Sequence, residues 1–204
     1  MSYRTSHKDF AELARHFYEC LVRDWAEFKR FDPNIKSYYK NLGERLNSFS
    51  TLLNIEEKRA GAVIEFQREV EKYIPTARDA YKALRLEIKE TQSKEFYDSC
   101  AFGQYRKVRN SLNKLILFWE KLAQKAEGRD LKTTTIFREQ ALNLVALKKA
   151  RDEAEMKYRV DVARRDKLRK ELYGLMMIAS MQGKRIFRSW DKSRYKDYFF
   201  KQTP

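Results

Sequence analysis

The side chains that most often carry covalent or metal chemistry are few and scattered in this sequence. Its histidines are His7 and His16, and its cysteines are Cys20 and Cys100. Neither histidine has a cluster of carboxylates at metal-ligand spacing. The pair Gly183-Lys184 lacks the upstream glycine of a phosphate-binding GxxxxGK[ST] loop. No GxSxG motif or Cys–His pairing indicates a nucleophile. We therefore expect no enzymatic activity, no metal site and no cofactor, and interpret the chain as a binding or structural protein.

The chemistry that the sequence does hold in excess is positive charge. It has 44 Lys and Arg against 29 Asp and Glu, a net charge of +15 among 204 residues. Residues 101–204 hold +14 of that +15. Such an asymmetry indicates a polyanionic partner, which could be anionic lipid headgroups, nucleic acid or an acidic protein tail.

Twelve basic residues of the second half are our candidate lipid contacts. Those near a predicted turn are Lys121, Lys125, Arg129 and Lys132; those on the helical stretch that follows are Lys148, Lys149, Arg151, Arg164, Arg165, Lys167, Arg169 and Lys170. Each Lys or Arg near an anionic membrane contributes about 1 kcal/mol, so such a set would bind cooperatively. The binding would be salt-sensitive. The competing interpretation is a solvated helix face with i,i+4 ion pairs, for example Glu155–Arg159 and Asp161–Arg165.

Lipid fits the basic stretch better than nucleic acid does. Between Arg164 and Lys170 no aromatic residue or glycine is interleaved with the basic residues. Single-stranded nucleic acid binders commonly use such aromatic side chains to stack on bases. The i,i+4 pairs account for part of the charge, but they cannot neutralise a surplus of +14.

These charges must be positioned by helices. Glycine and proline together number nine, too few for a β-sandwich with regular turns. Apolar residues at steps of three and four predict helices over 8–31, 34–126 and 131–190. Pro75 should bend the second helix, because it removes a backbone donor and clashes with the preceding turn. We predict an all-α fold, an elongated bundle of three long kinked helices in a domain over residues 1–190.

Local signals set the predicted helix boundaries. Asp32 suits an N-cap and Pro33 suits the first position of the second helix. Gly128 is the expected C-terminal stop of that helix. Asp130, or one of the three threonines at 133–135, can cap the third helix.

The tail over 191–204 is rich in Lys and aromatic residues, and it either packs back on the helices or serves as an interaction motif. Its aromatic residues are Tyr195, Tyr198, Phe199 and Phe200.

The first predicted helix has one apolar stripe, for which two interpretations compete. The stripe consists of Phe10, Leu13, Ala14, Phe17, Leu21, Trp25 and Phe28. It could insert in a bilayer or pack on the other helices as core. The polar face carries both signs of charge, as Asp9, Glu12 and Arg15 illustrate, and this favours core packing.

Apolar stripes on the second and third predicted helices indicate association with partner helices. In the third helix these residues follow an average repeat of 3.5, which keeps one side of a helix against a partner. We assign five leucines to this core or dimer seam: Leu112, Leu115, Leu168, Leu172 and Leu175. We therefore expect a homodimer.

The sequence favours a peripheral and intracellular location. The widely separated Cys20 and Cys100 imply no disulfide framework, so a reduced setting is expected. The N-terminus shows no signal peptide. The longest uncharged stretch, residues 172–183, is too short to span a membrane. We expect a cytoplasmic protein, with any membrane contact at the surface.

Several stretches resemble the BAR domain superfamily, most closely the short single-domain BAR family associated with the base of cilia. The resemblance lies in Asp32-Pro33-Asn34, in Val70-Glu71-Lys72-Tyr73-Ile74-Pro75, and in residues 178–187 around Gly183-Lys184. Residues 86–90, followed by 105–112, also resemble the middle helix of amphiphysin-type domains. The resemblance implies an antiparallel, crescent-shaped homodimer that binds and bends anionic phospholipid membranes, at the cilium base or on another organelle.

Two other functions remain open at this point. One is a coiled-coil scaffold of a cytoskeletal or ciliary assembly, which would bind a protein partner and no lipid. The other is a basic helical binder of nucleic acid, which the spacing of basic and aromatic residues favours less. Lipid-independent partner capture would favour the scaffold, whereas nucleic-acid binding with a steep salt dependence would favour the third function.

Overall fold

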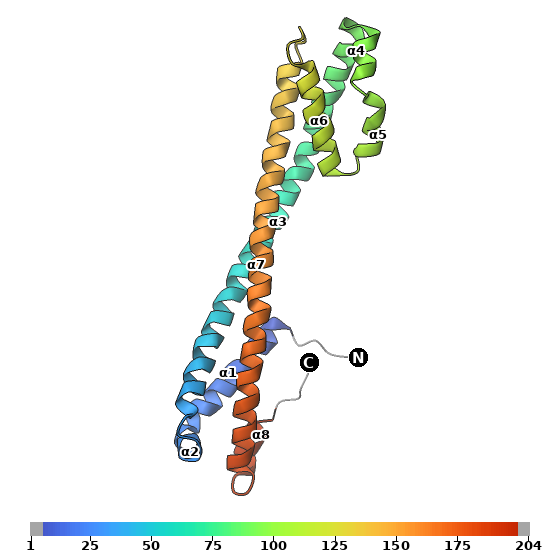
Figure 1. Ribbon diagram of the computed structural model, residues 1–204. Helices are drawn as coiled ribbons and strands as arrows, with labels where there is room; N and C mark the ends of the chain where they lie inside the picture. Colours follow the sequence, from blue (N-terminus) through green and yellow to red (C-terminus); the bar gives the residue numbers. More distant parts are fainter. Residues whose placement is uncertain (1–5, 200–204) are drawn as a thin grey trace. The chain divides into compact units, whose positions relative to one another are not determined.

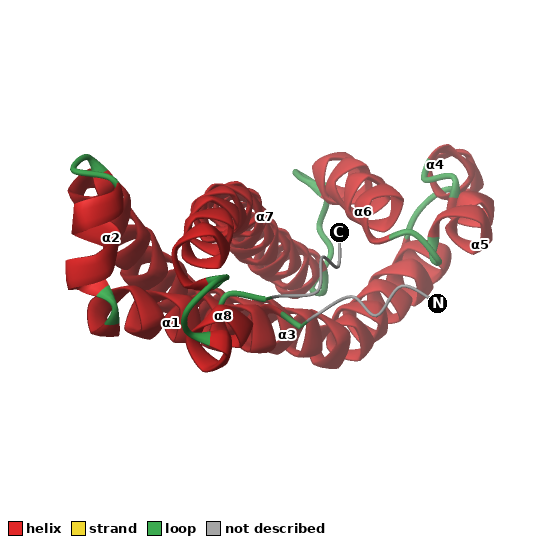
Figure 2. Cartoon of the chain, turned by 90° about the horizontal axis from the view of Figure 1, so that it is seen from below, coloured by secondary structure: helices red, strands yellow, loops and turns green. Residues whose placement is uncertain are grey.

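A computed structural model describes residues 6–199, and in that part all regular structure is helical (Figures 1 and 2). The all-α prediction is confirmed. The chain divides into two compact units. Unit 1 consists of Met1–Arg59 and Lys157–Pro204, and unit 2 of Ala60–Met156. The long helices α3 (Ile35–Thr91) and α7 (Thr134–Phe187) contribute residues to both units.

Unit 1 begins with two short helices where the sequence predicts one. Helix α1 covers His7–Arg23 and α2 covers Trp25–Phe31, so the predicted helix over 8–31 is divided at Asp24. Ser6 and Asp9 form a capping box at the start of α1, in which each side chain accepts a hydrogen bond from the other residue's backbone N–H. The division at Asp24 brings its carboxylate into the interior, where it has no exposed surface.

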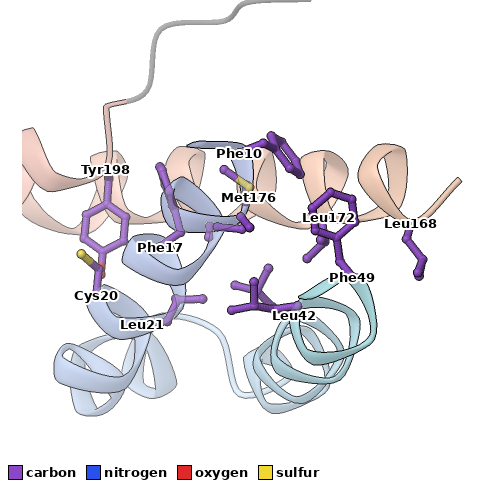
Figure 3. Close-up of a cluster of buried hydrophobic side chains, with 14 of the residues drawn as sticks. Phe10, Phe17, Cys20, Leu21, Leu42, Phe49, Leu168, Leu172, Met176 and Tyr198 are labelled. Atoms are coloured by element: carbon purple, nitrogen blue, oxygen red, sulfur yellow. The ribbon is translucent and has the colours of Figure 1, made fainter. Parts of the chain in front are cut away.

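The apolar stripe of the first two helices lies in the core of unit 1, which confirms core packing for that stripe. Phe17 and Phe28 are fully buried. They pack with residues of α3 and α7, some of which Figure 3 shows: Leu42, Phe49, Leu168, Leu172 and Met176. Burying a side chain of this size contributes about 1.5–3 kcal/mol relative to leaving it in water.

The start of α3 differs from the prediction by a short turn. The helix begins at Ile35, and Pro33 lies in the preceding turn rather than at the first helical position. The Asp32 carboxylate accepts a hydrogen bond from the Asn34 backbone N–H at 2.9 Å. This side-chain contact stabilises a turn in which the backbone has not yet become helical.

The predicted helix over 34–126 is interrupted well before its end. Pro75 lies inside α3, which continues to Thr91. Helix α4 (Lys94–Ser99), a 3-10 turn (Phe102–Gln104), α5 (Tyr105–Val108) and α6 (Leu112–Ala126) follow. Ser93 caps α4, and Ala101 adopts a left-handed conformation with φ 53°. These breaks let Phe102 and Tyr105 fold back onto Tyr81 of α3, with ring centroids 6.1 and 4.5 Å from it.

The core of unit 2 surrounds Trp119 of α6, which is fully buried. Tyr81 of α3 and Phe137 of α7 each lie with their ring centroid 6.3 Å from that of Trp119. Leu84, Ile88, Leu115, Leu122 and Leu144 complete this core. The centre of unit 2 is therefore α6 packed against parts of α3 and α7, with residues of α4, the 3-10 turn and α5 added to the same core.

The connection from α6 to α7 follows the predicted signals and adds one contact that the sequence does not reveal. Gly128, with φ +77°, comes directly after the end of α6, as predicted. Glu87 of α3 accepts hydrogen bonds from the backbone N–H groups of Lys132 and Thr133 at 2.7 and 2.9 Å. The Thr133 hydroxyl also donates to it. These bonds, led by those from Thr133, lower the pKa of Glu87.

The tail packs back on unit 1 after a turn at residues 188–190. Helix α8 covers Lys192–Asp197, and Tyr198 after it is fully buried. Its hydroxyl donates to the Asp24 carboxylate at 2.8 Å, and its carbonyl accepts from Ser180 at 2.6 Å. Burial first, then the bond to Asp24, raises the pKa of Tyr198 well above its usual range. Phe200 lies outside the described residues.

Gly183 allows this docking because it has no side chain. A Cβ atom at position 183 would lie 2.2 Å from Cγ of Tyr198, far inside van der Waals contact. The Tyr198 ring stacks on Phe187 at 5.7 Å and also packs against Phe17 and Phe28. Arg23 and Arg194 compensate the buried charge of Asp24, at 2.7 and 3.2 Å.

Candidate anion-binding surface

Three of the candidate basic residues form an exposed group on α7 in unit 1. Arg164, Lys167 and Lys170 are exposed. Within the described residues, none of their side chains has a hydrogen-bond or ion-pair partner. We call these residues the α7 basic group. An unpaired cation on the surface keeps its full charge for an external anion, whereas a paired one first has to leave its carboxylate.

The two arginines between them have structural partners instead. Arg165 pairs with Glu56 of α3 and with Asp166, and only 12% of its side chain is exposed. The guanidinium of Arg169 lies 2.8 Å from Nδ1 of His7. Burial, followed by the charges of Arg165 and Arg169, lowers the pKa of His7, which favours the neutral ring as acceptor.

The predicted ion pair Asp161–Arg165 is absent among the described residues, because both members pair with α3. Asp161 forms an ion pair with Arg59, with 2.6 Å between the carboxylate and the guanidinium, and Arg165 pairs with Glu56. Partly buried ion pairs therefore join α3 to α7 in this part of unit 1, where intrahelical pairs were expected.

The candidates at the start of the basic stretch lie in unit 2 and are mostly neutralised. Lys148 and Arg151 both bind the carboxylate of Asp152, and the Lys148 bond is the first cause that lowers the pKa of Asp152. Arg151 also donates to Gln67 of α3 at 3.1 Å. Lys149 is exposed and has no partner among the residues described.

The four candidates near the turn divide in the same way. The Lys125 ammonium donates to the backbone carbonyl of Ser99, and the Arg129 guanidinium lies 4.3 Å above the ring of Phe96. Lys121 and Lys132 have exposed side chains without a partner in the described range. The sequence analysis missed Arg106, Lys107 and Arg109 of α5, which are also exposed. The absence of Asp and Glu from residues 99–119 was the signal that could have revealed them.

The charge surplus belongs to unit 1 rather than to one half of the sequence. Unit 1 has 25 Lys and Arg against 14 Asp and Glu, a net +11, while unit 2 has 19 against 15, a net +4. The nearly neutral residues 1–59 fold together with the strongly basic residues 157–204. The chain therefore has its main positive field around unit 1.

The leucines assigned to a core or dimer seam lie in the cores of the chain itself. Leu168 and Leu172 are buried in unit 1, where Leu175 packs against them, as Figure 3 illustrates for the first two. Leu115 is buried in unit 2, and Leu112 packs against that core. Helices of the same chain cover this stripe, so it presents no open apolar face to a second copy.

Cys20 lies beside His16 on α1, with 3.6 Å between its Sγ and Nε2 of the imidazole, although the sequence analysis expected no Cys–His pairing. Cys20 and Cys100 are both free and buried, and burial raises the pKa of Cys20 to about 11. The thiol of Cys20 is therefore protonated at neutral pH.

Among the described residues, no helix combines the length and the apolar character that crossing a bilayer requires.

Comparison with known proteins finds no match to this chain. No protein-family model matches the chain, and no curated protein or solved structure does so either.

Proposed function

We propose that this chain is a peripheral membrane protein that binds anionic lipid surfaces through unit 1. The observation that carries the proposal is the α7 basic group, Arg164, Lys167 and Lys170, exposed and unpaired on a unit with a net charge of +11. Each of these residues would contribute about 1 kcal/mol near an anionic surface, and the remaining positive charge of unit 1 would add long-range attraction.

The finer part of the proposal is a cytoplasmic homodimer that senses or generates curvature of the membrane at the base of cilia or of another organelle membrane. It rests on the resemblance to BAR domains. Because Leu168 and Leu172 already lie in the core of unit 1, the two copies would have to meet through other residues. Light scattering tests this part: a dimer mass for the purified protein supports it, and a monomer mass at all concentrations contradicts it.

Co-sedimentation with vesicles tests the membrane proposal. Vesicles of phosphatidylserine and phosphatidylcholine, in several diameters, are mixed with the protein at low and at physiological salt. We expect binding at both salt concentrations, weaker at the higher one because ions screen exposed charges over about 8 Å. Affinity that changes with vesicle diameter would support curvature sensing, and equal affinity for all diameters would oppose it.

A pair of matched variants locates the contact. Arg164→Gln, Lys167→Gln and Lys170→Gln together should weaken binding tenfold or more. The control changes three basic residues of unit 1 that already have acidic partners: Lys8, Lys40 and Arg45, which pair with Glu57, Glu44 and Glu171. Their replacement by Gln removes the same net charge. Equal losses in both variants would mean that charge acts without a defined site, and no binding by the unmodified protein would refute the proposal.

One observation favours the protein scaffold as a second candidate function. Unit 2 has an open, mainly apolar hollow of about 630 Å³ between α6 and α7. Ile116, Leu117, Val145 and Met156 line it, and Leu117 and Met156 are more than half exposed. An apolar groove between helices suits a helical protein segment. Capture of a partner without lipid, lost in Leu117→Ser with Met156→Ser, would support this function.

A further inference from the structure

Unit 2 has a second basic surface, which is separate in sequence from the α7 basic group. Residues 99–119 contain no Asp or Glu. Within or just after this stretch lie Arg106, Lys107 and Arg109 of α5 and Lys114 and Lys121 of α6, all exposed. In the part of the chain that is described, none of these five side chains has a partner. We call them, with Leu117, the α5–α6 surface.

The aromatic core of unit 2 determines which side chains of α5 face outwards. The Tyr105 ring stacks on the Tyr81 ring at 4.5 Å, and Val108 packs against the same core. Helix α5 also contacts α6. With Tyr105 and Val108 directed inwards, the basic residues between and after them remain in solvent. Their exposure is a consequence of the packing and leaves their charge available.

Helix α6 places one apolar side chain among the lysines. Trp119 and Leu115 face the core, so the other side of the helix is directed outwards. Leu117 lies there, 57% exposed, with Lys114 one turn before it and Lys121 one turn after it. An exposed leucine between two unpaired lysines is unfavourable in water alone, but it suits an interface that is apolar below and anionic above.

We propose that the α5–α6 surface is a second membrane contact, in which Leu117 enters the interfacial region while the basic side chains bind lipid phosphates. Lysine and arginine can extend their charged ends to the phosphates while their apolar stems lie along the membrane. The inference rests on the proposed function, since both need an anionic membrane. It adds a contact with an apolar anchor, which the α7 basic group does not have.

The side chains around this surface favour lipid over nucleic acid. Binding of single strands depends on aromatic rings available for stacking on bases. Phe102, Phe118 and Trp119 are buried, and Tyr105 is stacked on Tyr81. Double-stranded nucleic acid would use the positive charges, but it would offer Leu117 no apolar environment. The leucine therefore distinguishes the two partners.

A charge-matched pair of variants tests the inference with the same vesicles as above. Arg106→Gln, Lys107→Gln and Arg109→Gln together should weaken vesicle binding about tenfold or more at physiological salt. The control replaces Lys82, Arg85 and Arg138 of unit 2 by Gln; their partners are Asp79, Tyr97 and Glu127. It removes the same net charge from the same unit, and we expect a loss of about twofold or less.

A fluorescent label tests the role of Leu117 directly. Because Cys20 and Cys100 are buried, an environment-sensitive dye should react mainly at a new cysteine in Leu117→Cys. We expect its emission to shift to the blue when anionic vesicles are added. The same dye in Glu139→Cys, at an exposed position of α7, should show no shift. Equal emission from both labels would overturn the apolar anchor.

The outcomes separate this inference from the proposed function. Normal vesicle binding by the α5 variant, together with loss in the variant of the α7 basic group, would overturn only the inference. No vesicle binding by the unmodified protein would overturn both. Unchanged vesicle binding with loss of binding to duplex DNA or RNA would assign the surface to nucleic acid and overturn the lipid contact. Loss of vesicle binding in the α5 variant but not in its control would support it.

Discussion

Units 1 and 2 bury similar aromatic clusters, but different contacts stabilise the two clusters. In unit 1 the ring of Tyr198 joins Phe17, Phe28 and Phe187. Its hydroxyl binds the buried Asp24, and Gly183 provides the space for the ring. In unit 2 the Tyr81 hydroxyl and the Trp119 ring N–H are buried and have no hydrogen-bond partner among residues 6–199. The aromatic cluster of unit 1 thus depends on a few polar contacts and one glycine, whereas the cluster around Trp119 in unit 2 depends on apolar packing.

The largest effect should come from removing the ring at the centre of unit 2. Trp119→Ala should lower the free energy of unfolding by about 3–5 kcal/mol, because it leaves a cavity among Tyr81 and Phe137. Urea unfolding measures the loss. Hydrogen exchange then shows whether the amides of unit 1 keep their protection, as the comparison of the two units predicts. An unfolding free energy within 1 kcal/mol of the original would contradict this packing.

Unit 1 should respond to a single methyl group. Gly183→Ala places a Cβ atom where the Tyr198 ring lies, so the ring must move and the free energy of unfolding should fall by about 1–3 kcal/mol. Limited proteolysis should cut residues 191–199 faster. Gly174→Ala is the control, since a Cβ atom there would meet nothing within 4 Å. It should stabilise α7 by about 0.5–1 kcal/mol. The same sign for both variants would contradict the docking of Tyr198.

A smaller effect, dependent on pH, should come from the contact of Glu87 in α3 with Lys132 and Thr133 before α7. Glu87 has a lowered pKa in the folded chain, so its stabilising contribution is present above its unfolded pKa of about 4.3 and is lost as the pH falls through the folded value. Glu87→Gln should cost about 1 kcal/mol at pH 7 and much less at pH 3. Urea unfolding at both pH values measures this difference. Glu90→Gln, at an exposed position of the same helix, should show no such change.

Much of the fold could be predicted from local patterns. The stripe of Phe10, Phe17 and Leu21 repeats with the period of a helix, and it is buried. Gly128 ends α6 because glycine adopts the left-handed conformation at low cost. The long helix α7 was predicted within a few residues at each end, since its period continues without an internal proline. These features depend on neighbours in the sequence.

The features that the sequence analysis missed depend on residues far apart in the chain. The break at Asp24 has no strong local signal, because its cause is Tyr198, 174 positions later. The end of α3 at Thr91 follows from the packing of Phe102 and Tyr105 on Tyr81. Whether a lysine or arginine is free, like Arg164, or paired, like Arg165, depends on the facing helix. Six of the twelve candidates have partners. Lys148 and Arg151 pair with Asp152 of their own helix, whereas the other four contact other segments of the chain.

The late position of Tyr198 in the sequence has a consequence for synthesis on the ribosome. Residues 1–59 emerge first, but their partners in unit 1 lie in residues 157–198. Unit 2, residues 60–156, is complete before them. At 5–20 residues per second, the aromatic side chains of α1 and α2 wait on the order of ten seconds for the residues that cover them. The nascent chain therefore exposes Phe17 and Phe28 to chaperones throughout that interval, and a ribosome that stalls before Tyr198 leaves unit 1 open.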